Sequence, residues 1–271
     1  MQLSARRQLD AVQRRLTSPS RRLALLAPSD AHIPNVFHDV RGDREEHRTL
    51  FSEMQRFRGQ VYLEDGAIRP NDLIDGRHVV EADNHSWHLL VHDENGTIAG
   101  CIRYQAHDIR SLFLRLSVFS TAIAACPQWG PALKRAVHSE VTMAKSLNLS
   151  FVEVGGWALA EHIRGTSEAL RLGLAAYSLG QLMGGAVGMS TATRRHCSSS
   201  ILRRMGGQSL KYAGTPIPSY YDPQYECEME ILRFYSWNPN PRYALWVEEI
   251  RQSLLHIPVI GSTAWELAAA G

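Results

Sequence analysis

The chain is short of the residues and patterns that mark several classes of protein. Its 271 residues include only four cysteines, widely spaced and without a Cys-x-x-Cys pair: Cys101, Cys126, Cys197 and Cys227. This spacing argues against a zinc site or a disulfide framework and fits reduced thiols. The apolar window around Ser117–Cys126 is far shorter than the roughly 20 residues that span a bilayer. The N-terminal segment also lacks the apolar core of a secretory signal. The sequence therefore predicts a soluble, cytoplasmic protein without a metal.

Strong net charge is lacking too. The formal net charge is +2, so no overall field attracts nucleic acid, and we expect no nucleic-acid partner. The positive charge is instead local, because residues 1–22 hold six arginines and one acid, Asp10. Apolar residues in this segment share one helical face. Such an arm either docks on an acidic protein or an anionic membrane surface, or is a solvated helix or frayed end.

Hydrophobic periodicity and turn residues predict the elements of the rest of the chain. The first half contains a loop-rich connector over Ser18–Arg48, an amphipathic helix over Glu45–Val61, a hairpin of Trp87–Val91 with Thr97–Tyr104, and mainly helical structure over Ser111–Asn148. The second half contains strands at Phe151–Val154, Gly184–Thr193, Gln208–Ala213 and Tyr225–Tyr235, and helices at Ser167–Leu182, Ser198–Met205 and Pro241–Leu255.

A hairpin thus precedes a strand–helix–strand unit. This order predicts a mixed sheet flanked by helices, an α+β fold in three layers. A Rossmann fold is a poor fit, since no Gly-x-Gly-x-x-Gly follows a strand. We divide the chain into a basic arm and connector over residues 1–44, a main domain over 45–236 and a C-terminal helical extension over 237–271.

The segment from residue 151 to 167 holds the best candidates for chemistry. Glu153 lies in mid-strand between apolar residues, where a carboxylate is costly to bury unless it is paired or functional. One interpretation is a partly desolvated general base with a raised pKa. The other is a salt bridge across the sheet, for example to Arg103. Gly155 and Gly156 then predict a bulge or a close approach of the backbone, with free groups for an amide-bearing ligand or a thioester carbonyl.

The turn of Arg164, Gly165, Thr166 and Ser167 leads into the next helix. Free N–H groups and the helix dipole at such a start bind phosphate, and an arginine adds a charged donor. The alternative is that Thr166 or Ser167 is a plain N-cap.

Residues 77–236 resemble the GNAT superfamily of N-acyltransferases. The turn and the two residues after it, Glu168 and Ala169, resemble the family's pyrophosphate loop, with Ser167 where glycine is usual. The segment from Thr193 to Gly207 resembles the family's closing helix, with Leu202 where many acetyltransferases place a tyrosine acid. The resemblance implies a splayed central sheet, while Leu202 argues against ordinary acetyl transfer.

A narrower resemblance, over residues 50–155, is to acyl-homoserine-lactone synthases and N-acyl amino acid synthases. It rests on Arg58 with Tyr62, on the segment from Glu81 to Ser86 that contains Asp83, on Arg103, and on Glu153. Ser86 replaces the second aspartate of the lactone synthases, which argues against S-adenosylmethionine as acceptor. Gly156, Trp157 and Ala158 also replace their next motif. The N-acyl amino acid synthases are the better match.

The resemblance implies an enzyme that moves a long acyl group from acyl carrier protein or acyl-CoA to an amine. Glu153 would be the base, Arg58, Tyr62, Asp83 and Arg103 would shape the acceptor side, and the donor would meet Gly155, Gly156, Trp157, Leu159, Arg164, Gly165, Thr166 and Ser167. An acidic carrier protein would suit the basic arm and the cluster of Arg194, Arg195, Arg203 and Arg204, which is otherwise a solvated face. The alternatives are an acetyl-CoA-dependent N-acetyltransferase and a non-catalytic module that binds acyl thioesters.

Overall fold

The computed structural model describes residues 22–29, 31–109, 116–195 and 197–263. The predicted amphipathic segment of the basic arm lies outside these ranges. In the described part of the chain, no helix has the length and apolarity needed to cross a membrane.

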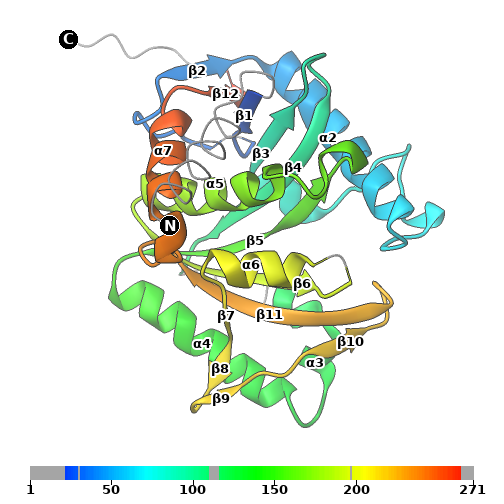
Figure 1. Cartoon of the computed structure of the whole chain (residues 1–271), viewed down its shortest axis with the longest axis vertical. Helices are drawn as coiled ribbons and strands as arrows, with labels where there is room; N and C mark the ends of the chain where they lie inside the picture. Colours follow the sequence, from blue (N-terminus) through cyan, green and yellow to red (C-terminus); the bar gives the residue numbers. More distant parts are fainter. Residues whose placement is uncertain (1–21, 30, 110–115, 196, 264–271) are drawn as a thin grey trace, which may run out of the picture.

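A ten-stranded mixed sheet forms the centre of the molecule (Figure 1). Nine of its strands follow the order β10-β11-β6-β5-β4-β3-β1-β12-β2, and β7 pairs with β11. The strands are β1 (Arg22–Leu26), β2 (Asp39–Gly42), β3 (Trp87–His92), β4 (Ile98–His107), β5 (Ser150–Leu159), β6 (Ala186–Thr193), β7 (Gln208–Ser209), β10 (Tyr220–Asp222), β11 (Cys227–Tyr235) and β12 (Pro258–Gly261). β5 and β6 are parallel, while β3, β4 and β5 pair antiparallel. The predicted mixed α+β sheet is confirmed.

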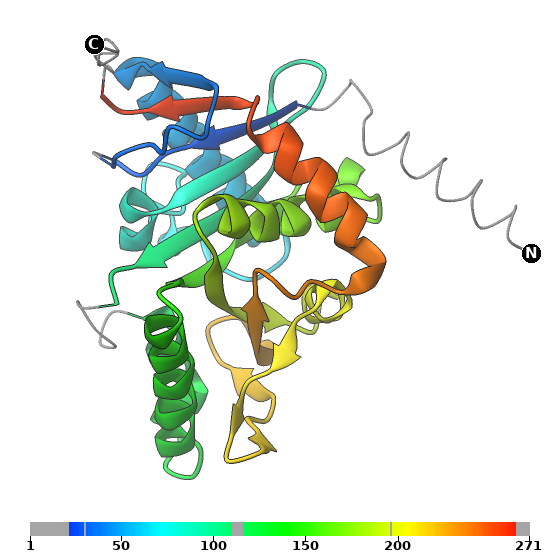
Figure 2. The ribbon, with the colours of Figure 1, turned by 90° about the vertical axis from the view of Figure 1, so that its left-hand side faces the viewer.

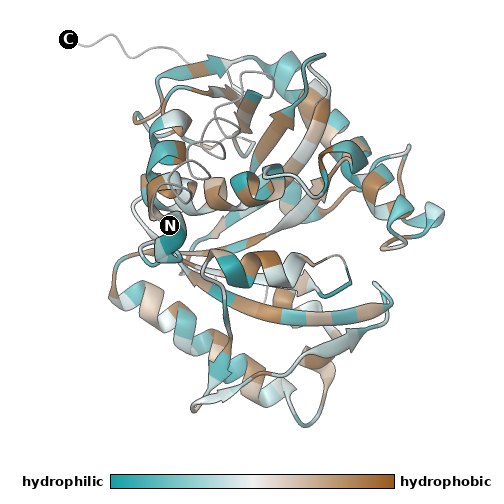
Figure 3. Cartoon of the chain, in the orientation of Figure 1, coloured by the Kyte–Doolittle hydropathy of each residue, from teal (hydrophilic) through white to brown (hydrophobic). Residues whose placement is uncertain are grey.

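Helices cover both faces of this sheet. The main helices are α2 (Arg44–Glu64), α4 (Gly130–Ser146), α5 (Glu168–Leu182), α6 (Ser198–Met205) and α7 (Ala244–Leu254), with the short α3 (Ala122–Ala125) before α4. Leu23 and Leu25 of β1 join the core beneath α5, α6 and α7. Ala24 and Leu26 point to the opposite face, where they join the core beneath α2. Figures 1 and 2 show α7 crossing α5, and apolar residues mark the central strands in Figure 3.

The predicted connector over Ser18–Arg48 is wrong in part, because it contains β1 and β2. Residues Leu23 to Leu26 are buried on both faces of the sheet, so they lack the alternation that marks a half-buried strand. The parallel partner of β1 is β12, which pairs Leu25 with Val259. No local pattern reveals a pairing over that distance. The sheet therefore contains strands from all three regions into which the sequence was divided, residues 1–44, 45–236 and 237–271.

Most other predicted elements are present with shifted ends. The predicted strand Phe151–Val154 extends to Leu159, and the predicted strand Gln208–Ala213 is divided into β7 and β8 (Lys211–Tyr212). β8 forms a separate two-stranded sheet with β9 (Thr215–Pro216). The predicted strand Tyr225–Tyr235 begins at Cys227, and the last helix begins with a single turn, Pro241–Tyr243, before α7.

Candidate active site

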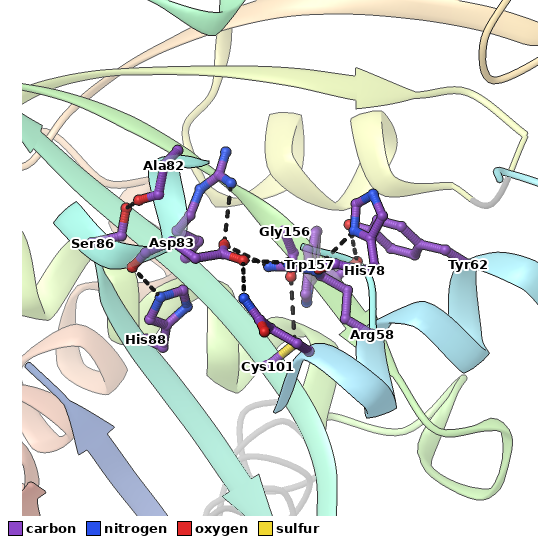
Figure 4. Close-up of polar contacts among 12 residues, drawn as sticks. Arg58, Tyr62, His78, Ala82, Asp83, Ser86, His88, Cys101, Gly156 and Trp157 are labelled. Atoms are coloured by element: carbon purple, nitrogen blue, oxygen red, sulfur yellow. Dashed lines mark hydrogen bonds and ion pairs between the residues drawn. The ribbon is translucent and has the colours of Figure 1, made fainter. Parts of the chain in front are cut away.

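A buried ion pair lies between α2 and the short helix η2 (Glu81–His85). The Arg58 guanidinium donates to both carboxylate oxygens of Asp83, at 2.9 and 2.6 Å. The side chains of Arg58 and Asp83 are 1% and 0% exposed. Gln55, one turn before Arg58 on α2, adds a third hydrogen bond of 3.1 Å to Asp83. Figure 4 shows the contact between Arg58 and Asp83.

The charge states of this cluster follow from its contacts. Burial would raise the pKa of Asp83, but the hydrogen bonds and charge of Arg58 outweigh it and lower that pKa to about 2. Burial, together with the charge of Arg58, lowers the pKa of His78 to about 4. The pKa of His88 is also lowered to about 4, chiefly by burial. Both histidines are therefore neutral at pH 7. His78 Nδ1 accordingly accepts a 3.2 Å hydrogen bond from Arg58 Nε.

Arg103 brings a second guanidinium to the same carboxylate. Its Nη1 lies 3.5 Å from Asp83 Oδ1, and its Nε is buried without a hydrogen-bond partner within the described structure. Two cations thus share one carboxylate, and their neighbouring histidines are neutral. The cluster has a surplus of positive charge. Burial makes that surplus costly unless an anion joins it.

Two glycines of β5 make room for these arginines. Gly156 has φ +61°, and a Cβ placed there would lie 3.2 Å from both Arg58 Nη1 and Arg103 Cβ. Gly155 is less crowded, since a Cβ there would lie 3.6 Å from Arg103 Nη2. The register between β4 and β5 shifts at this point, where Cys101 faces Ala158 and Arg103 faces Gly155. One residue of β4 therefore faces two of β5, which is the predicted bulge.

Tyr62 and Cys101 surround the bulge. The Tyr62 hydroxyl donates a long, 3.4 Å hydrogen bond to the carbonyl of Trp157, and the Cys101 thiol donates at 3.4 Å to the carbonyl of Gly156. Burial raises the pKa of the Cys101 thiol to about 12 and also raises that of Tyr62. Both groups stay protonated at pH 7. The predicted acceptor-side residues Arg58, Tyr62, Asp83 and Arg103 are thus brought together around Gly156.

Glu153 lies on β5 two residues before Gly155, on the same face as Arg103. Its carboxylate accepts hydrogen bonds from His107 Nε2 (3.0 Å) and from Ser117 N (3.0 Å), Ser117 Oγ (2.7 Å) and Val118 N (3.1 Å). Burial would raise its pKa, but the hydrogen bonds from His107 and Ser117 lower it. The expectation of a raised pKa is therefore wrong. The suggested salt bridge to Arg103 is replaced by the pair with His107.

The side chains of Arg164 and Thr166, in the turn before α5, already contact other groups of the chain. Arg164 donates to the Leu159 carbonyl and forms a 2.7 Å ion pair with Asp65, just after α2. Thr166 Oγ1 accepts from Glu168 N at 3.2 Å, whereas Ser167 makes no side-chain cap among the described residues. Glu168 in the first turn pairs with Arg171 at 3.2 Å. Gly165 has φ +73° and open space where a Cβ would stand, so it leaves the backbone there accessible.

An apolar cavity of about 40 Å³ lies on the opposite face of the sheet, under α5 and α6. Its walls include Val152 and Val154 of β5, Gly188 of β6 and Leu202 of α6. Leu202, which takes the place of a tyrosine acid in the resemblance, is buried in this wall. Trp157 packs on the same core, and its indole Nε1 is buried without a partner within the described structure.

In the cluster of Arg194, Arg195, Arg203 and Arg204, three of the arginines pair with acidic or carbonyl groups of this chain. Arg203 pairs with Glu230 at 2.8 Å, and Arg194 lies 3.6 Å from the same carboxylate. Arg195 donates to the carbonyls of Tyr225 and Glu226. These partners favour the interpretation of a structural and solvated face, while a contact with a carrier protein stays a prediction.

Sequence reasoning missed several members of the site. Gln55 could have been found, because it lies three residues before Arg58 and so shares its helix face. His107 could have been found as well, since it shares a strand face with Arg103. Ser117 carries no signal, because its contact with Glu153 joins segments that are 36 residues apart.

Comparison with known proteins supports the fold. No protein-family model matches the chain, and no curated protein matches it in sequence. Among solved structures it is similar to BjaI, a CoA-dependent acyl-homoserine lactone synthase seen with SAM and isopentyl-CoA, with TM-score 0.52 and 12% identity, covering 90% of this chain and 95% of that one. The chain shares the fold of this synthase.

Two further structures are similar. MesI, another CoA-dependent acyl-homoserine lactone synthase, has TM-score 0.50 and 14% identity, covering 86% of this chain and 95% of that one. FeeM, an N-acyl amino acid synthase from uncultured soil microbes, has TM-score 0.47 and 12% identity, covering 81% of this chain and 92% of that one. The GNAT-like fold predicted from the motifs is confirmed, and at these identities the likeness is one of fold.

Proposed function

We propose that this protein is an N-acyltransferase that moves an acyl group from a thioester to the amine of an amino acid. The observation that carries the proposal is the cluster of Arg58, Asp83 and Arg103. It offers a buried surplus of positive charge beside the glycine bulge of β5. The carboxylate of an amino acid would supply the missing anion, and Arg103 would receive it as a charge-assisted partner.

Ser86 also bears on the charge of the acceptor. Its side chain is fully buried, and its hydroxyl donates to the Ala82 carbonyl at 2.5 Å. It therefore offers no second carboxylate to a cationic acceptor such as S-adenosylmethionine. An anionic acceptor fits the net charge of the cluster better than a cationic one.

The donor would approach along the end of β5. Its acyl chain would enter the apolar cavity, and its thioester carbonyl would lie near the bulge at Gly156 and Trp157. The phosphate of CoA or of a carrier-bound phosphopantetheine would meet the backbone at Gly165 and the positive end of the α5 dipole. The apolar walls of the cavity, formed by Val152, Val154 and Leu202, would receive the first carbons of the acyl chain, and its volume of about 40 Å³ does not set the length of that chain.

The reaction needs a proton acceptor, because an amino acid carries an ammonium group at pH 7. The neutral amine attacks the thioester carbonyl, the C–N bond forms and the C–S bond breaks. The thiolate leaves and takes up a proton. Glu153 accepts four hydrogen bonds, which fill its lone-pair sites. We therefore infer that it receives the amine's proton through a group that already donates to it, and Ser117, which is exposed, is the candidate relay.

The test combines the purified protein with acetyl-CoA, longer acyl-CoAs and acyl-loaded carrier protein, and with amino acids or S-adenosylmethionine. Mass spectrometry of amides and release of free thiol are measured together. N-acyl amino acids from a long-chain donor would support the proposal. Lactone products, acetyl transfer alone, or tight donor binding without any amide would each overturn it. The same donors supplied on CoA and on carrier protein decide between the two carriers.

A further inference from the structure

The turn between β10 and β11 is fixed against the end of α2 by one guanidinium. Arg195 donates to the carbonyls of Tyr225 and Glu226, at 2.7 and 2.6 Å. It also donates, at 3.3 Å, to the carbonyl of Asp65, the residue that follows α2. Arg69 adds a 3.4 Å ion pair with Glu226. The hairpin and the end of α2 lie on the same side of the molecule (Figure 1). The turn is therefore held beside the helix that carries the buried ion pair.

The Tyr225 side chain lies on the face of the sheet that carries Glu153. It is half-buried and packs against the apolar cluster that contains Phe151 and Val118. Phe151 lies two residues before Glu153 on β5 and so shares its face, and Val118 donates its backbone N–H to Glu153. The phenol of Tyr225 therefore belongs to the side of the sheet on which the acceptor amine would meet its proton acceptor.

The hydroxyl of Tyr225 is available to a ligand and lies within reach of positive charge. Within the described part of the chain, Tyr225 forms hydrogen bonds only through its backbone. Burial and the charge of Asp222 raise the pKa of its hydroxyl, while the charges of Arg103 and Arg58 lower it. The phenol is therefore close enough to both guanidiniums to interact with their charges through space. Because its pKa is raised on balance, it stays protonated at pH 7 and can donate.

We propose that Tyr225 is a second binding residue for the acceptor, that its hydroxyl donates to the carboxylate with which Arg103 pairs, and that Arg195 positions it. The inference rests on the proposed function and deepens it, because it assumes an amino acid acceptor. A carboxylate between Arg103 and Tyr225 would accept a hydrogen bond from each. A neutral amine lacks that anion, so Tyr225 would help the site to select amino acids over simple amines.

The experiment compares the amino acid with the highest rate and its α-carboxamide as acceptors of the same acyl group. The carboxamide keeps the amine and the side chain but has no negative charge. We expect wild type to favour the amino acid in kcat/KM. Tyr225→Phe should lose about tenfold or more of that preference, chiefly through a higher KM for the amino acid. Tyr221→Phe is the matched control, because it alters an exposed phenol of the same hairpin, and it should keep the wild-type preference.

Arg195→Ala tests the positioning role. It should also lower the preference for the amino acid, because the turn loses its contact with the end of α2. Tyr225→Phe should then add little in the Arg195→Ala protein, since both changes weaken the same contact with the acceptor. Additive losses would overturn the positioning role of Arg195. Arg194→Ala is the matched control, since its guanidinium lies near Glu230 instead.

The same preference in Tyr225→Phe as in wild type, with amide formed from the amino acid, would overturn the inference and leave the proposed function standing. Absence of amide from every acceptor in wild type would instead refute the proposed function. Thermal-shift measurements with the amino acid alone need no turnover. Stabilisation that is weaker in Tyr225→Phe than in wild type supports the inference, and equal stabilisation of the two proteins contradicts it.

Discussion

Arg58 and Asp83 form a buried ion pair, with two hydrogen bonds of 2.9 and 2.6 Å, that joins α2 to η2. The contact couples stability to the candidate active site, because the same carboxylate also faces Arg103. Removing one partner of a buried pair leaves the other charge uncompensated.

Asp83→Asn should therefore destabilise the protein by about 3 kcal/mol or more. Unfolding in urea measures the change. Asp39→Asn is the control, since Asp39 pairs with Arg41 at the surface and such pairs contribute about 0–1 kcal/mol. Equal effects of the two substitutions would show that the buried pair contributes no more than the exposed one.

Stability should fall in acid in two stages. His78 and His88 have folded-state pKa values of about 4, below the ordinary value of 6.5. The unfolded chain thus binds more protons between these values, and stability is lost as pH falls from about 6.5 to about 4. Asp83 has a folded-state pKa of about 2 against an ordinary value of 3.8. Its contribution is present above pH 3.8 and is lost as pH falls towards 2.

Urea midpoints across this pH range test the first stage. His88→Gln should flatten the loss between pH 6.5 and 4, because glutamine has no group that takes up a proton there when the chain unfolds. An unchanged slope in that variant would remove His88 as a cause.

Gly156→Ala should impair both folding and activity, whereas Gly155→Ala should be tolerated. At Gly156 the positive φ and the 3.2 Å approach to Arg58 and Arg103 both oppose a side chain. We expect a loss of about 1–3 kcal/mol in stability and a large fall in turnover. Urea unfolding and amide formation measure them. Similar behaviour of the two variants would show that the bulge does not depend on a glycine at 156.

Arg103→Leu should raise the KM for the amino acid acceptor at least about tenfold, since a charge-assisted partner of its carboxylate is lost. The KM for the thioester should change little. Arg41→Leu, at the surface pair with Asp39, is the control and should change neither. A rise in both KM values would indicate a general disturbance of the site.

Glu153→Gln should lower turnover at least about tenfold, as expected for loss of a proton acceptor. It should also reduce stability, because an amide NH₂ would replace one oxygen that accepts from His107 or Ser117. Ser117→Ala removes the proposed relay but keeps both backbone donors to Glu153. Turnover that is reduced in Glu153→Gln but normal in Ser117→Ala would leave the carboxylate its role and exclude the relay through Ser117.

The sequence by itself determined the elements whose signals are local. The apolar face of α2, the turn between β3 and β4, and the glycines that end α6 were visible, and the order of the elements indicated a mixed sheet. The GNAT-like fold was implied by the resemblance of the turn before α5 and of the segment from Thr193 to Gly207. Arg58, Asp83 and Arg103 were identified through the resemblance to the acyl-homoserine-lactone and N-acyl amino acid synthases, and Gly156 through its place at the end of a predicted strand.

Only the tertiary structure decided the partners of these groups. The pKa of Glu153 is lowered because Ser117, Val118 and His107 converge on it, and no local spacing predicts such a meeting. Strands β1 and β12 stayed hidden for the same reason, since their parallel pairing joins the two ends of the chain. The place of Tyr225 beside the arginines of the site likewise becomes visible only once Arg195 ties the turn between β10 and β11 to the end of α2. Local propensity identifies an element, but burial and charge depend on contacts made across the whole fold.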